Sequence, residues 1–459
     1  MGIITWSIPF FFLLIGLELL TARVRHRPLF RLNDSISDLS LGILSQMSGI
    51  FTKLLQYGVY FLIVKHASVQ QLSPAIPAWP GGPPVTFVGG FEVHLANLAG
   101  WTVAFVVVDF AYYWLHRLSH EVHILWAGHV VHHSSEEYNL TVALRQSSLH
   151  GLFTWVFYLP LAFAGVPVEV FISCHAINLV YQFWIHTRTV GRLPASIEAV
   201  WNTPSHHRVH HGVNPKYQDK NYAGVFIVWD KWFGTWVPEE EEPVYGITKP
   251  LASWNPVWAN VHVFVELWRT FRATKRWSDK WRVVFASPSW RPADVGPSIV
   301  APEVTRATAT QYDPEVAPPV LRYAFAQFLA ALAASLGVLK VQGTLPIDQL
   351  AALAFYVVLT LSNLAVLLEG RDWAVVPEAA RHAVLGVVAL VLGGLGAIPP
   401  LVSVAGAVFC AVSVLWLLSL RRHLGNGADS ALTGHERSGR QPARGDRHPE
   451  RSEGSALRV

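Results

Sequence analysis

The sequence predicts an all-α integral membrane protein, a bundle of several membrane-spanning helices with a histidine-rich cap. Three observations lead to this fold class. The chain of 459 residues is 52% hydrophobic and only 14% charged, whereas about a quarter of the residues of an ordinary soluble domain are charged. The apolar residues are gathered in long blocks, as membrane spans require. The 21 histidines are clustered rather than spread along the chain.

The first apolar block, Ile3–Leu20, has no positive residue ahead of it and is followed by Arg23, Arg25 and Arg27. A secretory signal peptide carries its charges in front, so this block is expected to be a retained anchor. Because positive loops stay in the cytoplasm, the N-terminus should face outside and the arginine-rich loop inside.

Further apolar blocks predict more membrane-crossing segments of near 20 residues. A long block, Leu152–Ile185, is interrupted by Gly165-Val166-Pro167 and predicts a helical hairpin with short arms. The single spans are expected at Leu41–Val64, Leu95–Leu115, Leu321–Leu339, Leu350–Leu368, Ala383–Ile398 and Leu401–Leu420.

Threading these spans places His116–His133, residues 187–316, Arg371–Arg381 and Arg421-Arg422 on the same side as the first arginine loop. The loops expected outside carry few positive charges. The chain is therefore predicted to be a multi-pass protein whose histidine cap is cytoplasmic.

The chain divides into five regions. They are N-terminal anchor helices (1–90), a histidine-bearing region with the hairpin (91–240), a cytoplasmic or interfacial segment (241–316), a four-span membrane region (317–422) and a disordered tail (423–459). Between Trp254 and Trp281, tryptophans and arginines recur at helical spacing. This pattern predicts an amphipathic helix that lies in the membrane interface or packs on the cap.

Composition excludes some classes of protein. Cys174 and Cys410 lie far apart in apolar blocks, which argues against a disulfide framework and a cysteine-based metal site. The formal net charge is only +4 and no basic stripe is present, so nucleic acid is not an expected partner.

The histidines form three short patterns. His116 and His120 are four residues apart, and an H-x-x-H-H pattern occurs twice. On a helix, residues at i, i+3 and i+4 share a face, so each pattern should point its imidazoles in one direction. The two H-x-x-H-H patterns are His129, His132, His133 and His207, His210, His211.

Eight imidazoles are too many for one four-coordinate zinc ion and suit two metals with open positions. Nitrogen ligands without sulfur are compatible with iron, zinc or copper, and membrane chemistry without another redox group favours iron. The fold class thus becomes a helical bundle with a cytoplasmic di-metal cap. His186, at the cytoplasmic end of the hairpin, is a candidate ninth ligand.

Other polar residues have less defined roles. His206 is expected to be incidental or to support the ligands, and His123, His150 and His175 to be structural. Asp109 lies seven residues before His116, on the same helix face. It is expected either to orient a ligand imidazole or to pair with Arg117 or Arg145.

The histidine patterns resemble those of the fatty acid hydroxylase and sterol desaturase superfamily, and the phrases Asn-Thr-Pro-Ser-His-His and Asp-Lys-Asn-Tyr-Ala-Gly resemble its alkylglycerol monooxygenase branch. The segments that carry the resemblance are Asp109–Glu121, Trp126–Leu140, Ala143–Ser147, Tyr181–Thr187, Asn202–Gly212, Asp219–Gly224 and Trp229–Thr235.

The resemblance implies two iron ions, dioxygen as oxidant, a lipid substrate from the bilayer and tetrahydrobiopterin as electron donor. It also implies that Glu121 matters for activity. Without a fused haem domain, electrons should come from a small cofactor or a separate protein partner.

The expected reaction is hydroxylation of a lipid C–H bond, which in an alkylglycerol cleaves the ether to a fatty aldehyde and a glycerol. One alternative is a fatty acid, sterol or carotenoid hydroxylase or desaturase. An alternative of another class is a metal transporter or sensor, although transporters place such residues near the bilayer midplane.

Overall fold

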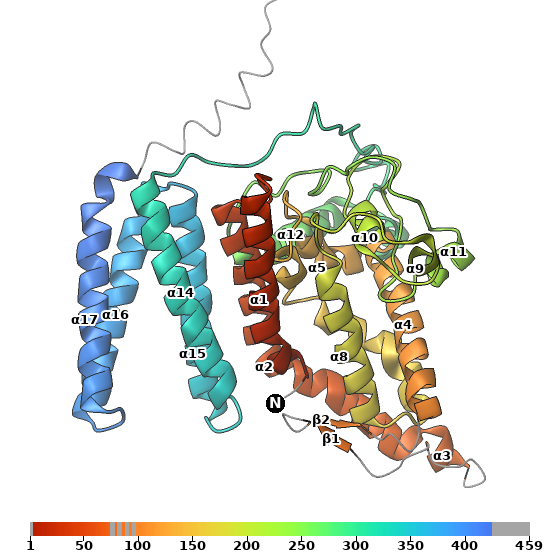
Figure 1. Ribbon diagram of the computed structural model, residues 1–459, viewed down its shortest axis with the longest axis horizontal. Helices are drawn as coiled ribbons and strands as arrows, with labels where there is room; N and C mark the ends of the chain where they lie inside the picture. Colours follow the sequence, from red (N-terminus) through yellow and green to blue (C-terminus); the bar gives the residue numbers. More distant parts are fainter. Residues whose placement is uncertain (1–2, 74–78, 80–84, 88–90, 94–97, 425–459) are drawn as a thin grey trace, which may run out of the picture.

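The structure is a computed structural model that describes residues 3–73, 79, 85–87, 91–93 and 98–424. Within these residues, seven helices are long and apolar enough to cross a membrane. The seven are α1 (Ile3–Val24), α2 (Leu32–Ala67), α4 (Leu98–Glu121), α14 (Pro318–Val341), α15 (Ile347–Leu368), α16 (Val375–Gly394) and α17 (Pro400–Ser419). All but α2, which runs obliquely across the bundle, have similar directions, and a cap of short helices and loops covers one end (Figure 1).

These helices confirm the predicted fold class, and each expected single span is present. The expected hairpin is also present, but its first arm is broken into short pieces and neither arm is long enough to count among the seven. Gly165 adopts φ 79° at the turn, a conformation that glycine reaches without strain. The hairpin comprises α6 (Gly151–Thr154), η3 (Trp155–Tyr158), α7 (Leu159–Phe163) and α8 (Val168–Trp184).

Short elements complete the chain. One antiparallel strand pair, which the sequence did not predict, lies at the end opposite the cap (Figure 1). The remaining elements are α3 (Val69–Leu72), β1 (Val85–Phe87), β2 (Phe91–Val93), α5 (His123–His133), η2 (Val142–Leu144), α9 (Ala195–Glu198), α10 (Pro204–His210), α11 (Val228–Phe233), α12 (Pro256–Ala273), α13 (Trp277–Phe285), η4 (Asp372–Ala374) and η5 (Arg421–His423).

Helix α2 joins the two halves of the bundle. With 36 residues it is much longer than a membrane span requires. Its first half packs Ile36, Ile43 and Met47 against α14 and α15. Its second half places Tyr60 in a second apolar core with α4, α7 and α8. One continuous helix therefore holds the C-terminal four-span bundle beside the histidine-bearing half.

The ends of the spans follow the predicted threading. Figure 1 shows the α14–α15 and α16–α17 connections at the end opposite the cap, and the α15–α16 connection at the cap end. At that connection, Glu369 accepts hydrogen bonds from Ser253 Oγ and from the backbone N–H of Trp254. The four-span region is thus tied to the segment that follows the histidines. The tail from residue 425 lies outside the described residues.

The amphipathic segment is two helices rather than the predicted single one. Helix α12 begins at Pro256, where the Asn255 side chain caps the backbone N–H groups of Val257 and Trp258. It ends at Ala273, and the backbone N–H of Lys275 then donates to Asp294. Helix α13 turns back as the second arm of a helical hairpin, here called the α12–α13 hairpin.

Candidate metal centre

Three helices at the cap end supply eight of the candidate histidines. The last two turns of α4 carry one pair, the last turns of α5 carry three histidines, and α10 with its C-cap carries three more. Helix α10 begins with Pro204 after Thr203, whose side chain forms a capping box with His206. His206 therefore helps to begin the helix that positions the last cluster.

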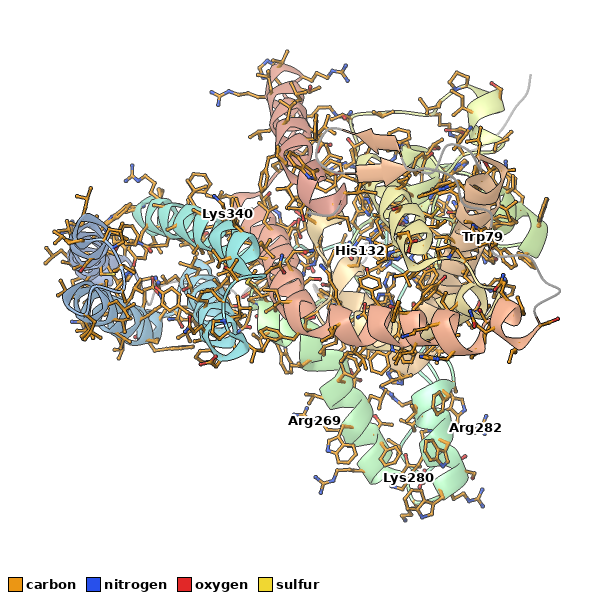
Figure 2. All side chains as sticks on the ribbon, turned by 90° about the horizontal axis from the view of Figure 1, so that it is seen from below. Trp79, His132, Arg269, Lys280, Arg282 and Lys340 are labelled. Carbon is orange, nitrogen blue, oxygen red and sulfur yellow. The ribbon has the colours of Figure 1, made fainter. Side chains whose placement is uncertain are left out.

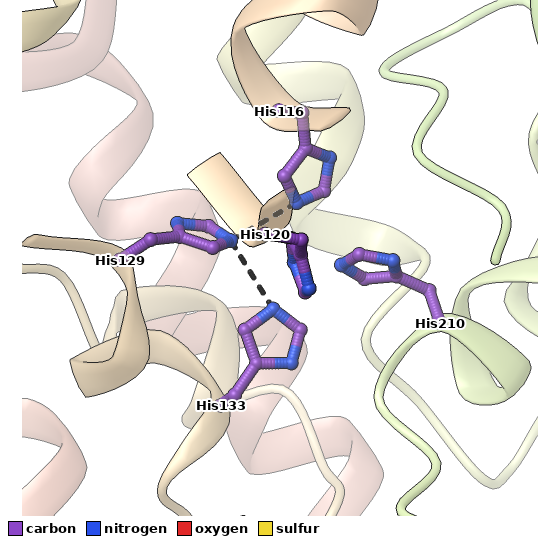
Figure 3. A group of neighbouring side chains, drawn as sticks. All are labelled: His116, His120, His129, His133 and His210. Carbon is purple, nitrogen blue, oxygen red and sulfur yellow. Dashed lines mark hydrogen bonds between the residues drawn. The ribbon is translucent and has the colours of Figure 1, made fainter. Parts of the chain in front are cut away.

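The nine predicted histidines come together as two groups whose ring nitrogens lie within 4.8 Å of one another in each group. Figure 3 shows the imidazoles of the first group converging from α4, α5 and α10. The first histidine group is His116, His120, His129, His133 and His210. The second histidine group is His132, His186, His207 and His211.

The three histidines of each H-x-x-H-H pattern are shared between the two groups. The sequence predicted instead that all three would point in one direction. Helix α5 gives His129 and His133, at i and i+4, to the first group and His132 to the second. The α10 segment does the reverse, because His207 and His211 join the second group and His210 the first. On a helix, i+3 and i+4 differ by about 100° in direction, so neighbouring histidines reach different sites.

Backbone carbonyls fix the orientation of four imidazoles. Each donates from Nδ1–H to a carbonyl oxygen, which leaves an unprotonated Nε2 that faces its group. The pairs are His116 with Tyr222 (2.7 Å), His132 with Arg145 (3.1 Å), His186 with Gln182 (2.8 Å) and His210 with Lys220 (2.9 Å).

This donor set fits metal ions. The Nε2 atoms of His132 and His186 are 3.2 Å apart, although both carry lone pairs that repel. A metal about 2.1 Å from each of two imidazole nitrogens at right angles would hold them about 3.0 Å apart. The Nε2 atoms of His120, His210 and His211 are buried without a hydrogen-bond partner among the described residues. Cations would satisfy these nitrogens, which water cannot reach.

Burial favours the neutral form of the imidazoles on α5 and α10. Loss of solvent, reinforced by the neighbouring imidazoles, holds the pKa values of His129, His133 and His207 well below the usual value. Burial also lowers the pKa of His132 to about 4. Neutral imidazole is the form that binds a metal, so the cap presents its ligands without first releasing protons.

Asp109 does neither of the things expected of it. Its carboxylate is fully buried and accepts hydrogen bonds from Asn178 Nδ2, Trp229 Nε1 and the backbone N–H groups of residues 225 and 226. Four donors satisfy the charge, so neither an imidazole nor an arginine is needed as its partner. Arg145 pairs instead with Asp38. Asp109 ties α4 to α8 and to the loop after α10.

Glu121 lies outside both histidine groups. Its carboxylate accepts a 2.9 Å hydrogen bond from Arg117 one turn earlier, and its side chain is 41% exposed. Glu121 thus occupies a partly exposed position on the surface of α4.

Tyr222 lies beside the first histidine group, although the sequence did not predict a role for it. Its ring packs against His116, His120 and His210, and its hydroxyl is buried without a hydrogen-bond partner among the described residues. Burial raises the pKa of Tyr222, with smaller contributions from the carboxylates of Asp219 and Glu121. The one indication of Tyr222 in the sequence is that it lies within the Asp-Lys-Asn-Tyr-Ala-Gly segment, which carries the family resemblance.

His150 is closer to the centre than expected. Its ring centroid lies 5.1 Å from that of His129, and its Nε2 is 3.0 Å from Ser119 Oγ. His175 packs on Tyr158, and His123 Nδ1 donates to the carbonyl of Val283. None of these three belongs to either group.

A cavity of about 410 Å³ adjoins the first histidine group. One wall includes ligand candidates of both groups, and the other is formed by α12 and the loop after α13. On this outer wall Arg291 and Glu266 form a 2.8 Å ion pair. Arg291 Nη1 and His262 Nε2 are buried there without partners among the described residues. We call this space the cap cavity.

Comparisons with known proteins agree with this site. The fatty acid hydroxylase profile matches residues 101–235, which include all nine histidines. Alkylglycerol monooxygenase of Xenopus tropicalis is 37% identical over 81% of this chain and 78% of its own length. The Homo sapiens alkylglycerol monooxygenase is 38% identical over 81% of this chain and 79% of its own length.

A more distant relative, the ornithine lipid hydroxylase OlsE of Rhizobium tropici, is 29% identical over 33% of this chain and 48% of its own length. No solved structure matches the chain. The similarity to the alkylglycerol monooxygenases extends over most of both chains. The protein therefore belongs to the alkylglycerol monooxygenase family and is an integral-membrane lipid monooxygenase with a fatty acid hydroxylase domain.

Proposed function

We propose that this protein is a di-iron enzyme that hydroxylates the ether-linked chain of an alkylglycerol. The observation that carries the proposal is the convergence of nine imidazoles into two adjacent groups. The cap would hold one iron with the first histidine group and the other with the second. When bound, such a pair would supply the activation of dioxygen, which no amino-acid side chain provides.

Hydrogen bonds and burial within the chain hold the two histidine groups in an orientation suited to binding metal. The backbone carbonyls of Tyr222, Arg145, Gln182 and Lys220 hold four imidazoles with Nε2 inward. Among the nine histidines, eight are buried and His120 is partly buried, so bulk water is largely excluded. A dry, oriented set of ligands favours oxidation of a C–H bond over loss of oxidant to solvent.

The named activity of the most similar proteins supports an ether lipid as substrate. Hydroxylation would fall on the chain carbon bonded to the ether oxygen, because the adjacent lone pair weakens that C–H bond. One oxygen atom of O2 enters the C–H bond, and the other leaves as water after two electrons and two protons are supplied. The resulting hemiacetal loses its glycerol alkoxy group with proton transfer and gives a fatty aldehyde and a glycerol.

The two electrons would come from a reduced pterin in the cap cavity. A pterin has an aminopyrimidine edge with N–H donors and a carbonyl acceptor. Glu266 and His262 Nε2 supply acceptors, and Arg291 Nη1 supplies a donor. Trp126 lines the same cavity and can stack on a flat ring. Replacing Glu266 with Gln should weaken binding of the pterin in equilibrium dialysis and leave metal content unchanged.

The cap is proposed to face the cytoplasm. Arg23 lies in the last turn of α1, Arg25 and Arg27 follow that helix, and Arg421 and Arg422 follow α17. Figure 1 places both of these chain positions at the cap end. Retention of positive residues on the cytoplasmic side supports that orientation.

The test of the function is metal analysis of detergent-purified protein, followed by aerobic incubation with an alkylglycerol and reduced tetrahydrobiopterin. We expect about two irons per chain and aldehyde formation that depends on the pterin. His132→Ala should lose turnover and the metal of the second histidine group, whereas His175→Ala, outside both groups, should keep turnover and both metals. A His132→Ala protein with full activity would contradict the ligand assignment. Folded protein without stoichiometric metal would contradict the di-iron proposal.

Product analysis separates the ether lipid from other lipid substrates. Iron at the expected ratio without aldehyde would keep the oxygenase and reject the alkylglycerol. Incubation with fatty acyl lipids, sterols and carotenoids would then identify hydroxylated or desaturated products.

A further inference from the structure

The α12–α13 hairpin extends sideways from the bundle. In Figure 2 the last two spans, α16 and α17, are seen nearly end-on, and the hairpin that carries Arg269, Lys280 and Arg282 projects sideways from the bundle. Figure 1 places α12 at the level of the cap. The hairpin therefore lies across the direction of the spans, at the end of the bundle where a bilayer surface would be.

Large apolar side chains on this hairpin are exposed. On α13, Trp277, Trp281 and Phe285 stand at i, i+4 and i+8, and they are 70%, 59% and 57% exposed. Spacing by four residues puts them on one face of the helix. On α12, Trp268 is 56% and Trp258 42% exposed. A soluble surface rarely leaves so many tryptophans together, so this face is expected to be covered.

The hairpin also carries surplus positive charge. Its two carboxylates are already paired, Glu266 with Arg291 and Lys249, and Asp279 with Arg282. Lys280 lies over the rings of Phe271 and Trp277, which places the ammonium beside the aromatic face. The six cations from residue 256 to 285 are Arg269, Arg272, Lys275, Arg276, Lys280 and Arg282.

We propose that the α12–α13 hairpin inserts its aromatic face into the headgroup region of an anionic bilayer leaflet. Tryptophan prefers this region because its ring is apolar and its N–H can bond to headgroups or water. The surrounding lysines and arginines contact the lipid phosphates, whose negative charge attracts them. The occupant of this face is thus the lipid of the protein's own membrane, not a second protein.

The hairpin is hydrogen-bonded to the helix that carries three of the candidate metal ligands. The backbone N–H of His123 donates to the carbonyl of Ala286, and His123 Nδ1 donates to that of Val283. These two bonds connect the end of α13 to the start of α5, the helix that carries His129, His132 and His133. Helix α12 forms the outer wall of the cap cavity. If the proposed function holds, this arrangement brings the cavity wall to the depth at which an ether lipid exposes its glycerol.

The test uses full-length protein in nanodiscs that contain anionic lipid. A fluorophore is attached to Cys in W281C, because the native Cys174 and Cys410 are buried and do not compete for the label. Quenching is measured with a nitroxide on the lipid acyl chain and with aqueous iodide. We expect strong quenching by the lipid nitroxide and protection from iodide.

Two variants calibrate the measurement. L54C lies in the α2 span with an 82% exposed side chain and should report the lipid environment. E240C lies in an exposed cap loop and should report water. A W281C probe that behaves like the E240C probe would overturn the proposal. Protection from both quenchers would also overturn it, because it would indicate a second copy of the chain on this face.

Lipid charge is the second arm of the test. Replacing the anionic lipid with a zwitterionic one should reduce quenching of the W281C probe by the lipid nitroxide, as should the R269Q/R272Q/R276Q variant in anionic lipid. If quenching is unchanged in both cases, the hairpin is not held at the membrane by attraction between its cations and anionic lipid. None of these readouts needs metal or turnover, so failure of the proposed oxygenase activity would leave them interpretable.

Discussion

His132 and His186 face each other through Nε2 atoms 3.2 Å apart, while the Nδ1 of each donates to a backbone carbonyl. Two lone pairs at this distance repel, and a cation between them converts the repulsion into two bonds. His186, which belongs to no H-x-x-H-H pattern, is thereby placed in the second histidine group with His132, His207 and His211.

Replacing His186 with Ala should selectively empty the second site. That site would keep three histidines, while the first would keep all five. We expect iron to fall from about two to about one per chain and turnover to be lost. Elemental analysis of purified protein measures the ratio, and His66→Ala, at an exposed position near the end of α2, is the control. Unchanged iron would remove His186 from the ligand set.

Removal of the hydroxyl should lower the stability of the protein at Tyr217 but not at Tyr222. The Tyr217 hydroxyl donates to the Glu241 carbonyl and accepts from the N–H groups of Glu240 and Glu241, so Y217F should cost about 1–3 kcal/mol of stability. The Tyr222 hydroxyl has no partner among the described residues, so Y222F should leave the melting temperature unchanged.

The same Y222F variant should keep its iron but lower turnover, because the unpartnered hydroxyl belongs to a ring that packs against three imidazoles of the first group. Thermal unfolding and product formation are measured on one preparation. Full turnover in Y222F would show that Tyr222 only fills space.

Asp109→Asn should destabilise the protein by about 2 kcal/mol. The new amide would turn its own N–H donors toward an N–H donor of Asn178, Trp229 or the backbone at residues 225 and 226, where a carboxylate oxygen accepts now. Iron bound by folded protein should stay near the wild-type ratio, since no imidazole contacts this carboxylate in the described residues. Asp348→Asn, at an exposed position, is the control for thermal unfolding.

Glu121→Gln tests the residue that only the family resemblance singled out. A partly exposed i,i+4 pair such as that with Arg117 contributes about 0.3–0.5 kcal/mol, so the melting temperature should hardly change. We expect iron to be retained and turnover to fall at least about tenfold, as for loss of a charge that acts on the reacting groups. Glu169→Gln, exposed at the start of α8, should keep its turnover. Equal turnover in both variants would leave Glu121 as a surface residue.

The C-terminal four-span region should depend on a buried ion pair. Glu378 and Arg381 on α16 are buried and joined at 2.5 Å, and Tyr323 of α14 donates to the same carboxylate. E378Q should destabilise this region by about 3–5 kcal/mol because it leaves a buried arginine unpaired. The E378Q/R381M double variant should recover part of that loss, which thermal unfolding of the two proteins can compare.

The sequence predicted the spans and the histidines because both depend on local chemistry. Uninterrupted apolar blocks of about 20 residues have few alternatives to a membrane helix. Clustered imidazoles at helical spacing have few uses other than metal binding. The fold class and the single spans are confirmed, and the metal-ligand roles stay predictions.

What the sequence could not predict depends on contacts between distant segments. Asp109 finds its four donors 69 to 120 residues away, in α8, in the loop after α10 and in α11. The turn between α12 and α13 is held by a hydrogen bond from the backbone N–H of Lys275 to Asp294, a residue that follows both helices in the chain. The division of each H-x-x-H-H pattern between two groups requires the angle at which α5 and α10 face each other, and no spacing along one helix contains that angle.

That division has a consequence for assembly of the centre. His132 and His133 are neighbours in the chain, as are His210 and His211, and the two members of each pair serve different groups. Consecutive Cα atoms are fixed about 3.8 Å apart, so the two sites are linked covalently at two points. The first iron to arrive would order α5 and α10 and thereby prepare the vacant neighbour. Loading of the wild-type chain should then be cooperative, so that chains with a single iron are rare, whereas His186→Ala, whose second site is impaired, stops at one.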